Sequence, residues 1–130
     1  MTAFRGFSKM AGLRALAFAW ALFGVWIAMA CFLDLSMAGF PDGYISPYAR
    51  ATGRLLEVLA WLCLAQSLYF AFRGLRSRPL GLASLGLQII VAAALTVVPI
   101  KVVQKCPQWE GCSRAYQALT GTMMDDGTGG

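Results

Sequence analysis

Two cysteines near the C-terminus, Cys106 and Cys112, have the spacing in this chain that points most directly to chemistry. Five residues separate them, and this stretch begins with Pro107 and ends with Gly111. Proline and glycine both favour a compact turn, and so short a loop lets the two Cα atoms come within disulfide range. We therefore expect a structural disulfide here, provided that this part of the chain faces an oxidising compartment.

Two other chemistries compete for the same cysteines. A structural zinc site needs about four Cys or His ligands, and the chain has no histidine and no CxxC motif. A thiol–disulfide enzyme usually carries CxxC as well, so the wider pair in this sequence fits that class less well. The missing histidine also removes His-ligated haem and the usual general base. We expect no catalytic residue, no metal and no cofactor.

The other two cysteines, Cys31 and Cys63, lie in apolar segments and are expected to pack as small hydrophobic residues. Hydrophobic residues make up 58% of the chain and charged residues 13%, about half the charged share of a soluble domain. Residues 15–33, 55–72 and 80–100 are continuous apolar stretches, each near the ~20 residues that cross a bilayer as a helix. The sequence thus predicts an all-α integral membrane protein with three transmembrane helices in one domain, 1–130.

Two other interpretations compete with this assignment. A soluble all-α protein with three buried helices is one. The other is a cleaved signal peptide, because a basic lead precedes the first stretch and Ala28-Met29-Ala30 resembles a cleavage site before Cys31. The first stretch is longer than a typical signal core, which favours a retained span.

Basic residues near the ends of the spans predict the orientation. The short turn 73–79 carries three arginines, so we expect this turn and the N-terminus to be cytoplasmic. The loop 34–54 and the tail 101–130 then lie on the periplasmic or other extracytoplasmic side, where the disulfide persists. Within the tail, residues 112–119 are expected to form a short helix that ends at Gly121.

Small residues recur along one face of the first span, at Ala17, Ala21, Gly24 and Ala28. Such a face lets two helix backbones approach closely in lipid. It suits packing within a three-helix bundle or docking against another subunit, and we expect some of each. The opposite face carries Trp26, and Trp61 lies well inside the second span.

One carboxylate and two amide side chains lie within the predicted spans, namely Glu57, Gln66 and Gln88. Polar groups in a membrane suggest a function by default. Gln66 and Gln88 have similar predicted depths in an antiparallel hairpin, so we expect them to hydrogen-bond to each other. Glu57 follows Arg54 by three residues, a spacing that favours an ion pair on a helix.

These features favour a non-catalytic small subunit that packs against and stabilises larger integral membrane proteins, in contact with lipids and without nucleic acid. The expected location is a bacterial inner membrane, in an energy-transducing or secretion assembly. A small oligomeric transporter or channel that uses Glu57, Gln66 and Gln88 is the first alternative. A membrane thiol–disulfide protein that uses Cys106 and Cys112 is the second.

Overall fold

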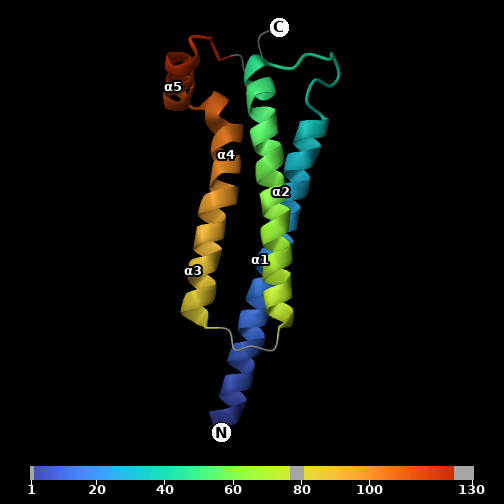
Figure 1. Ribbon diagram of the computed structural model, residues 1–130, viewed down its shortest axis with the longest axis vertical. Coiled ribbons are helices and arrows are strands. Elements are labelled where there is room, and N and C mark those ends of the chain that lie inside the picture. The colour runs from blue at the N-terminus through green and yellow to red at the C-terminus, as the bar shows by residue number, and fades with distance from the viewer. Residues whose placement is uncertain (1, 77–80, 125–130) are drawn as a thin grey trace.

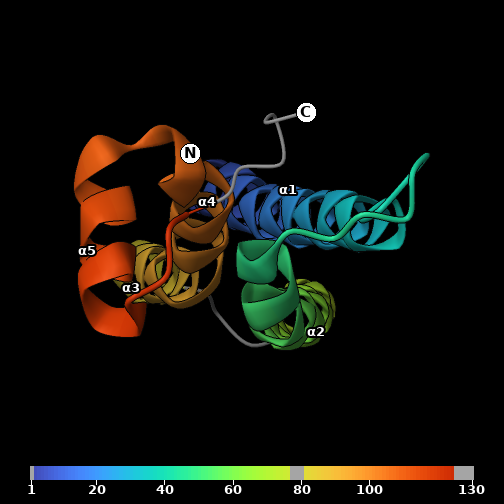
Figure 2. The same cartoon turned by 90° about the horizontal axis from the view of Figure 1, so that it is seen from above.

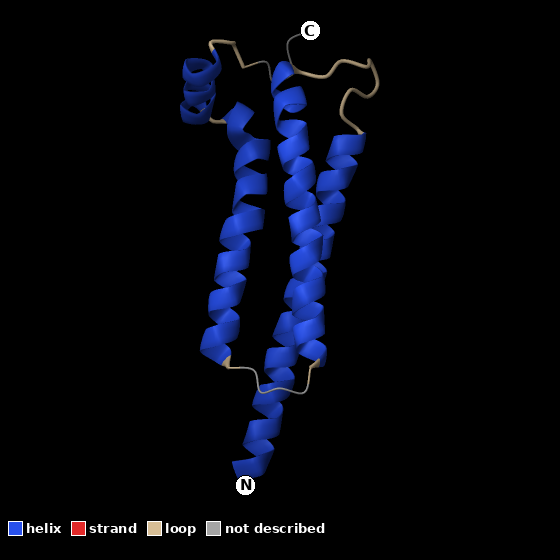
Figure 3. Ribbon diagram, viewed as in Figure 1, coloured by secondary structure: helices blue, strands red, loops and turns tan. Residues whose placement is uncertain are grey.

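The computed structural model describes residues 2–76 and 81–124, and every regular element within them is a helix (Figure 3). Helices make up 85% of the structure, which confirms the all-α prediction. In chain order the elements are α1 (Thr2–Ser36), α2 (Pro47–Leu75), α3 (Leu82–Ala92), the π-helix η1 (Ala93–Val97), α4 (Val98–Lys105), the 3₁₀ turn η2 (Cys106–Gln108) and α5 (Glu110–Thr120). Residues 77–79 of the predicted turn and 125–130 of the predicted tail lie outside the described residues.

Within the described residues, three helices are long and apolar enough to cross a membrane, as expected of a multi-pass membrane protein. They cover Lys9–Ser36, Pro47–Leu75 and Leu82–Gln108, with 28, 29 and 27 residues. Each exceeds its predicted span because helical backbone continues past the apolar core into segments with polar side chains. Such a helix is longer than the hydrocarbon thickness alone requires.

The three long helices stand side by side as an elongated bundle (Figure 1). α1 and α2 run antiparallel and pack closely, whereas α3, η1 and α4 form one continuous third rod (Figures 1 and 2). The C-terminus of α1, the N-terminus of α2, η2 and α5 share one end, which we call the α5 end. α5 lies crosswise beside α4 at this end (Figure 2), and the N-terminus lies at the opposite end.

Local sequence signals explain where two of the helices begin or end. Ser46 precedes α2, and its Oγ accepts a hydrogen bond from the Ala49 N–H at 3.1 Å, while Pro47 occupies the first helical position. α5 ends at Gly121, whose φ of 65° is left-handed, a conformation that glycine adopts without steric cost. The short tail helix and its stop at Gly121 are thereby confirmed, although the helix begins two residues earlier than predicted.

The third rod changes its winding at η1. The Val98 N–H donates to the Ala93 carbonyl, five residues back, and the Thr96 hydroxyl donates to the Ala92 carbonyl at 2.7 Å. Pro99 follows directly and has no N–H to donate. The prediction ended the span near Pro99, but the helix continues through this proline to Lys105.

Two buried clusters form the core, and α1 and α2 supply most of both. The cluster nearer the α5 end contains Ile27, Ala28, Cys31, Leu59, Ala60, Cys63 and Ile100. The other contains Ala17, Ala21, Phe70 and Leu85. The third rod adds one residue to each, Ile100 and Leu85. Its apolar window is only 17% buried, against 33% for α1, so it is the least enclosed of the three.

Candidate functional site

A disulfide joins Cys106 and Cys112, as the sequence predicted, with the Cα atoms 5.2 Å apart. It closes the turn between the third rod and α5. Cys106 is buried with 4% of its surface exposed, which suits a structural cross-link better than a reactive one. Cys31 and Cys63 are free and buried within the α1–α2 core, which agrees with the expected packing role.

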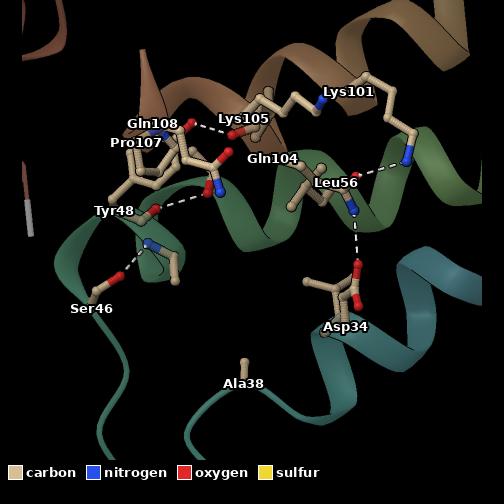
Figure 4. A pocket seen from close by; sticks show the side chains of 14 residues that line it. Asp34, Ala38, Ser46, Tyr48, Leu56, Lys101, Gln104, Lys105, Pro107 and Gln108 are labelled. Carbon is tan, nitrogen blue, oxygen red and sulfur yellow. Dashed lines mark hydrogen bonds between the residues drawn. The ribbon is translucent and has the colours of Figure 1, made fainter. Parts of the chain in front are cut away.

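Side chains at the α5 end tie the third rod to both other helices. The Tyr48 hydroxyl, on the first turn of α2, donates to the Val103 carbonyl at 2.7 Å. The Gln104 Nε2 donates to Asp34 Oδ2 at 2.9 Å, and Lys101 Nζ donates to the Gln104 Oε1 at 3.4 Å. Figure 4 shows Gln104 reaching from α4 to Asp34 of α1 across the pocket. The Tyr48 ring also meets the Tyr116 ring of α5 edge-on, 5.2 Å between centroids.

These links border a cavity of about 480 Å³, lined by Asp34, Leu35, Ala38, Ser46, Tyr48, Ala49, Thr52, Leu56, Lys101, Val103, Gln104, Lys105, Pro107 and Gln108 (Figure 4). Its polar groups bond mainly to one another, so the arrangement fastens helices together. No group of three or more metal-ligating side chains occurs within the described residues. Sequence reasoning missed these links, because it placed Asp34 and Tyr48 in the predicted loop 34–54 and not on helices.

The four small residues of the first span all lie buried on the side of α1 that faces α2. Ala17 and Ala28 are fully buried, Ala21 is 6% exposed, and Gly24 is buried as well. A Cβ added to Gly24 would overlap Ser67 Oγ of α2. This face is therefore filled by the chain's own α2 and is not free for another subunit.

A second cavity, which we call the α2–α3 groove, opens between α2 and the third rod. Its volume is about 590 Å³, and its lining is Leu62, Ala65, Gln66, Tyr69, Phe70, Leu87, Gln88, Val91, Ala92, Leu95 and Thr96. Both intramembrane glutamines line it, as their similar depths suggested. Most of the remaining lining is apolar, so the groove offers few hydrogen-bond partners.

The predicted bond between Gln66 and Gln88 is wrong. Gln66 Nε2 instead donates to Thr96 Oγ1 at 3.0 Å and to the Cys63 sulfur at 3.5 Å. Side chains on a helix lean towards its N-terminus, so on two antiparallel helices the glutamines lean in opposite directions. Gln66 thus reaches towards Thr96, whereas Gln88 leans away. The Oε1 atoms of both glutamines are buried and accept no hydrogen bond within the described residues.

Glu57 stands apart from the two glutamines. It is exposed on α2 and does not line the groove. The predicted ion pair with Arg54 is absent; within the part of the chain that the structure describes, the ion pair is Arg114 with Glu110 on α5, at 3.8 Å. The structure brings two of the three predicted polar residues together, and transport through them stays a prediction.

No protein-family model, curated protein or solved structure matches this chain.

Proposed function

We propose that this chain is a non-catalytic subunit of a larger membrane complex and that it contacts integral membrane partners through the outward faces of α1 and α2. The inward small face of α1 is already filled by α2, so the contact must use larger side chains. The proposal keeps the function predicted from the sequence and moves the docking surface to the opposite side of α1.

Two exposed tryptophans far from the helix ends carry this proposal. Trp26 of α1 is 65% exposed, and Trp61, near the middle of α2, is 59% exposed. Neither indole N–H has an acceptor within the described residues. Tryptophan in membrane proteins prefers the headgroup region, where its N–H finds water or lipid oxygen. Near mid-membrane depth, lipid tails offer no acceptor for the indole N–H. A partner helix can offer polar side chains as acceptors and gaps between side chains into which the indole ring packs.

The orientation and location belong to the same proposal. Arg73 and Arg76 lie at the end of α2 remote from α5, where Arg14 also enters the bundle. Positive residues favour the cytoplasmic side. The α5 end with its disulfide then faces the periplasm in this proposal, and the proposed setting is a bacterial inner membrane, in an energy-transducing or secretion assembly.

Native electrophoresis of the membranes tests this function. Wild-type chain, extracted in mild detergent, should migrate with a complex much larger than itself. Trp26→Leu together with Trp61→Leu keeps the spans apolar and should release the chain from that complex. Trp109→Leu, a matched change at an exposed tryptophan between η2 and α5, should have no effect. A wild-type chain that migrates alone would rule the proposal out.

A further inference from the structure

The hydroxyl of Thr96 fixes which way the Gln66 amide faces in the α2–α3 groove. Thr96 Oγ1 gives its proton to the Ala92 carbonyl at 2.7 Å, so towards Gln66 it can only accept. The Gln66 amide must therefore present its NH₂ group to Thr96, in agreement with the 3.0 Å bond from Gln66 Nε2 to Thr96 Oγ1. Its Oε1 is the atom that accepts nothing within the described residues.

The Gln88 amide has fewer hydrogen-bond partners than the Gln66 amide. Its Oε1 is buried without a donor, and its Nε2 makes no hydrogen bond within residues 2–76 and 81–124. A primary amide that uses neither side is costly in hydrocarbon. Lipid tails carry no hydrogen-bond donor or acceptor, so acyl chains in the groove would leave the cost unrelieved. The occupant of the groove must supply both a donor and an acceptor at the depth of Gln88.

We propose that the α2–α3 groove is the contact surface for a second copy of this chain, with Gln88 of each copy bonded to Gln88 of the other. An amide offers one N–H and one C=O on the same edge, so two amides related by a two-fold axis satisfy each other reciprocally. Two copies inserted in the same orientation hold Gln88 at the same depth automatically. Any other helix would need a donor and an acceptor placed at that depth.

The groove has the shape that such a contact needs. Ala65 of α2 and Ala92 of the third rod line it, and small residues let a third helix approach closely. The third rod of the partner would lie between α2 and α3 of the first copy, and the reverse contact is identical. Gln88 Oε1 becomes reachable by rotation about its terminal side-chain torsion, which has broad minima.

This contact is separate from the surface proposed for partner subunits, because neither Trp26 nor Trp61 lines the groove. The two ideas therefore fail independently. The first concerns other proteins in native membranes, and the second concerns the purified chain alone in lipid.

Energy transfer between donor- and acceptor-labelled full-length chains in liposomes measures the association. Wild type should associate increasingly as the protein-to-lipid ratio rises. Gln88→Leu should weaken the association constant about 3- to 30-fold, the range for an interhelical hydrogen bond in membranes. Gln117→Leu, the same change on α5 outside the groove, should match wild type. Association that is equal in Gln88→Leu and wild type would overturn the proposal, as would a wild type that stays monomeric at every ratio.

Cross-linking gives a second test that leaves Gln88 intact. Val91→Cys introduces a thiol into the groove, and Leu68→Cys introduces one on α2 outside it, where the leucine is 73% exposed. Mild oxidation in liposomes should yield a covalent dimer with Val91→Cys and little with Leu68→Cys. A dimer that forms equally at both positions, or only at Leu68→Cys, would show that the copies meet elsewhere.

Discussion

The two sides of α2 pack in different ways, one against α1 and the other against the third rod. Against α1, small residues bring the backbones together, and the interface is filled along most of its length. Against the third rod, α2 leaves a groove of about 590 Å³ and makes its firm contacts at the α5 end. One interface depends on close packing, and the other on a few polar links.

This difference shows that the two interfaces are stabilised by different interactions. Between α1 and α2, close van der Waals contact stabilises the pair, since lipid provides no hydrophobic drive for helices to associate. The third rod lacks a small-residue face towards α2 of comparable length, so polar groups at the aqueous end secure it. The middle of this interface remains open and holds two amide oxygens, those of Gln66 and Gln88, that accept no hydrogen bond within the described residues.

Gly24→Leu should have the largest effect, because it forces a side chain into the closed interface. The added atoms would overlap Ser67 Oγ, which is held by its 2.7 Å bond to the Cys63 carbonyl. Overpacking of this kind costs about 1–3 kcal/mol. SDS-induced unfolding followed by circular dichroism should show the loss. Gly12→Leu, where an added Cβ meets nothing within 4 Å, should not, and an equal loss in both variants would contradict the closed interface.

Loss of the disulfide should come next, through release of α5 from the third rod. Replacing both Cys106 and Cys112 with serine should cost about 2 kcal/mol, as expected for a short closed loop. Hydrogen exchange should rise in α5 and α4 while α1 and α2 keep their protection. Reductant serves as the matched control: it should reproduce the effect in wild type and change nothing in the double variant.

Tyr48→Phe removes one polar link and keeps the ring that meets Tyr116. The Val103 carbonyl then loses its 2.7 Å donor, at a cost of about 1 kcal/mol. The loss should appear as faster exchange at the α5 end of the third rod. Tyr69→Phe removes an exposed hydroxyl that accepts from Arg73 and should cost less. An effect of Tyr69→Phe equal to that of Tyr48→Phe would weaken the distinction between the two sides of α2.

Thr96→Val should have the smallest effect, since it acts inside the open groove. It removes the acceptor of Gln66 Nε2, and bonds of this kind average about 0.6 kcal/mol in membranes. Unfolding in SDS should shift only slightly. A loss as large as that of Gly24→Leu would mean that the groove is a principal support of the fold.

The sequence was sufficient for the features that depend on composition and local pattern. Apolar length predicted the three long helices, Pro107 and Gly111 predicted the turn that the disulfide closes, and Gly121 predicted the end of α5. The small face of α1 was visible at Ala17 and Gly24. The helix that covers this face could not be predicted, because periodicity shows which face carries small residues but not which helix packs against it.

The polar contacts could not be predicted because they depend on registers between helices. Gln66 bonds to Thr96 instead of Gln88 since side chains lean along their own helices, and depth counted from span ends ignores this direction. The link from Asp34 to Gln104 joins residues seventy positions apart. No local pattern specifies such a pair, and both residues are common at helix ends for other reasons.

The winding change at η1 divides the third rod into two arms, α3 and α4. α3 extends 11 residues beyond η1 towards the end remote from α5, which is about 17 Å at the helical rise. A rotation of only 5° or so at η1 would swing the Leu82 tip by about 1.5 Å by that length. α4 is anchored at the α5 end and Leu85 of α3 is fully buried in the core, so any rotation at this five-residue segment also moves Leu85 within the cluster that it shares with α1 and α2.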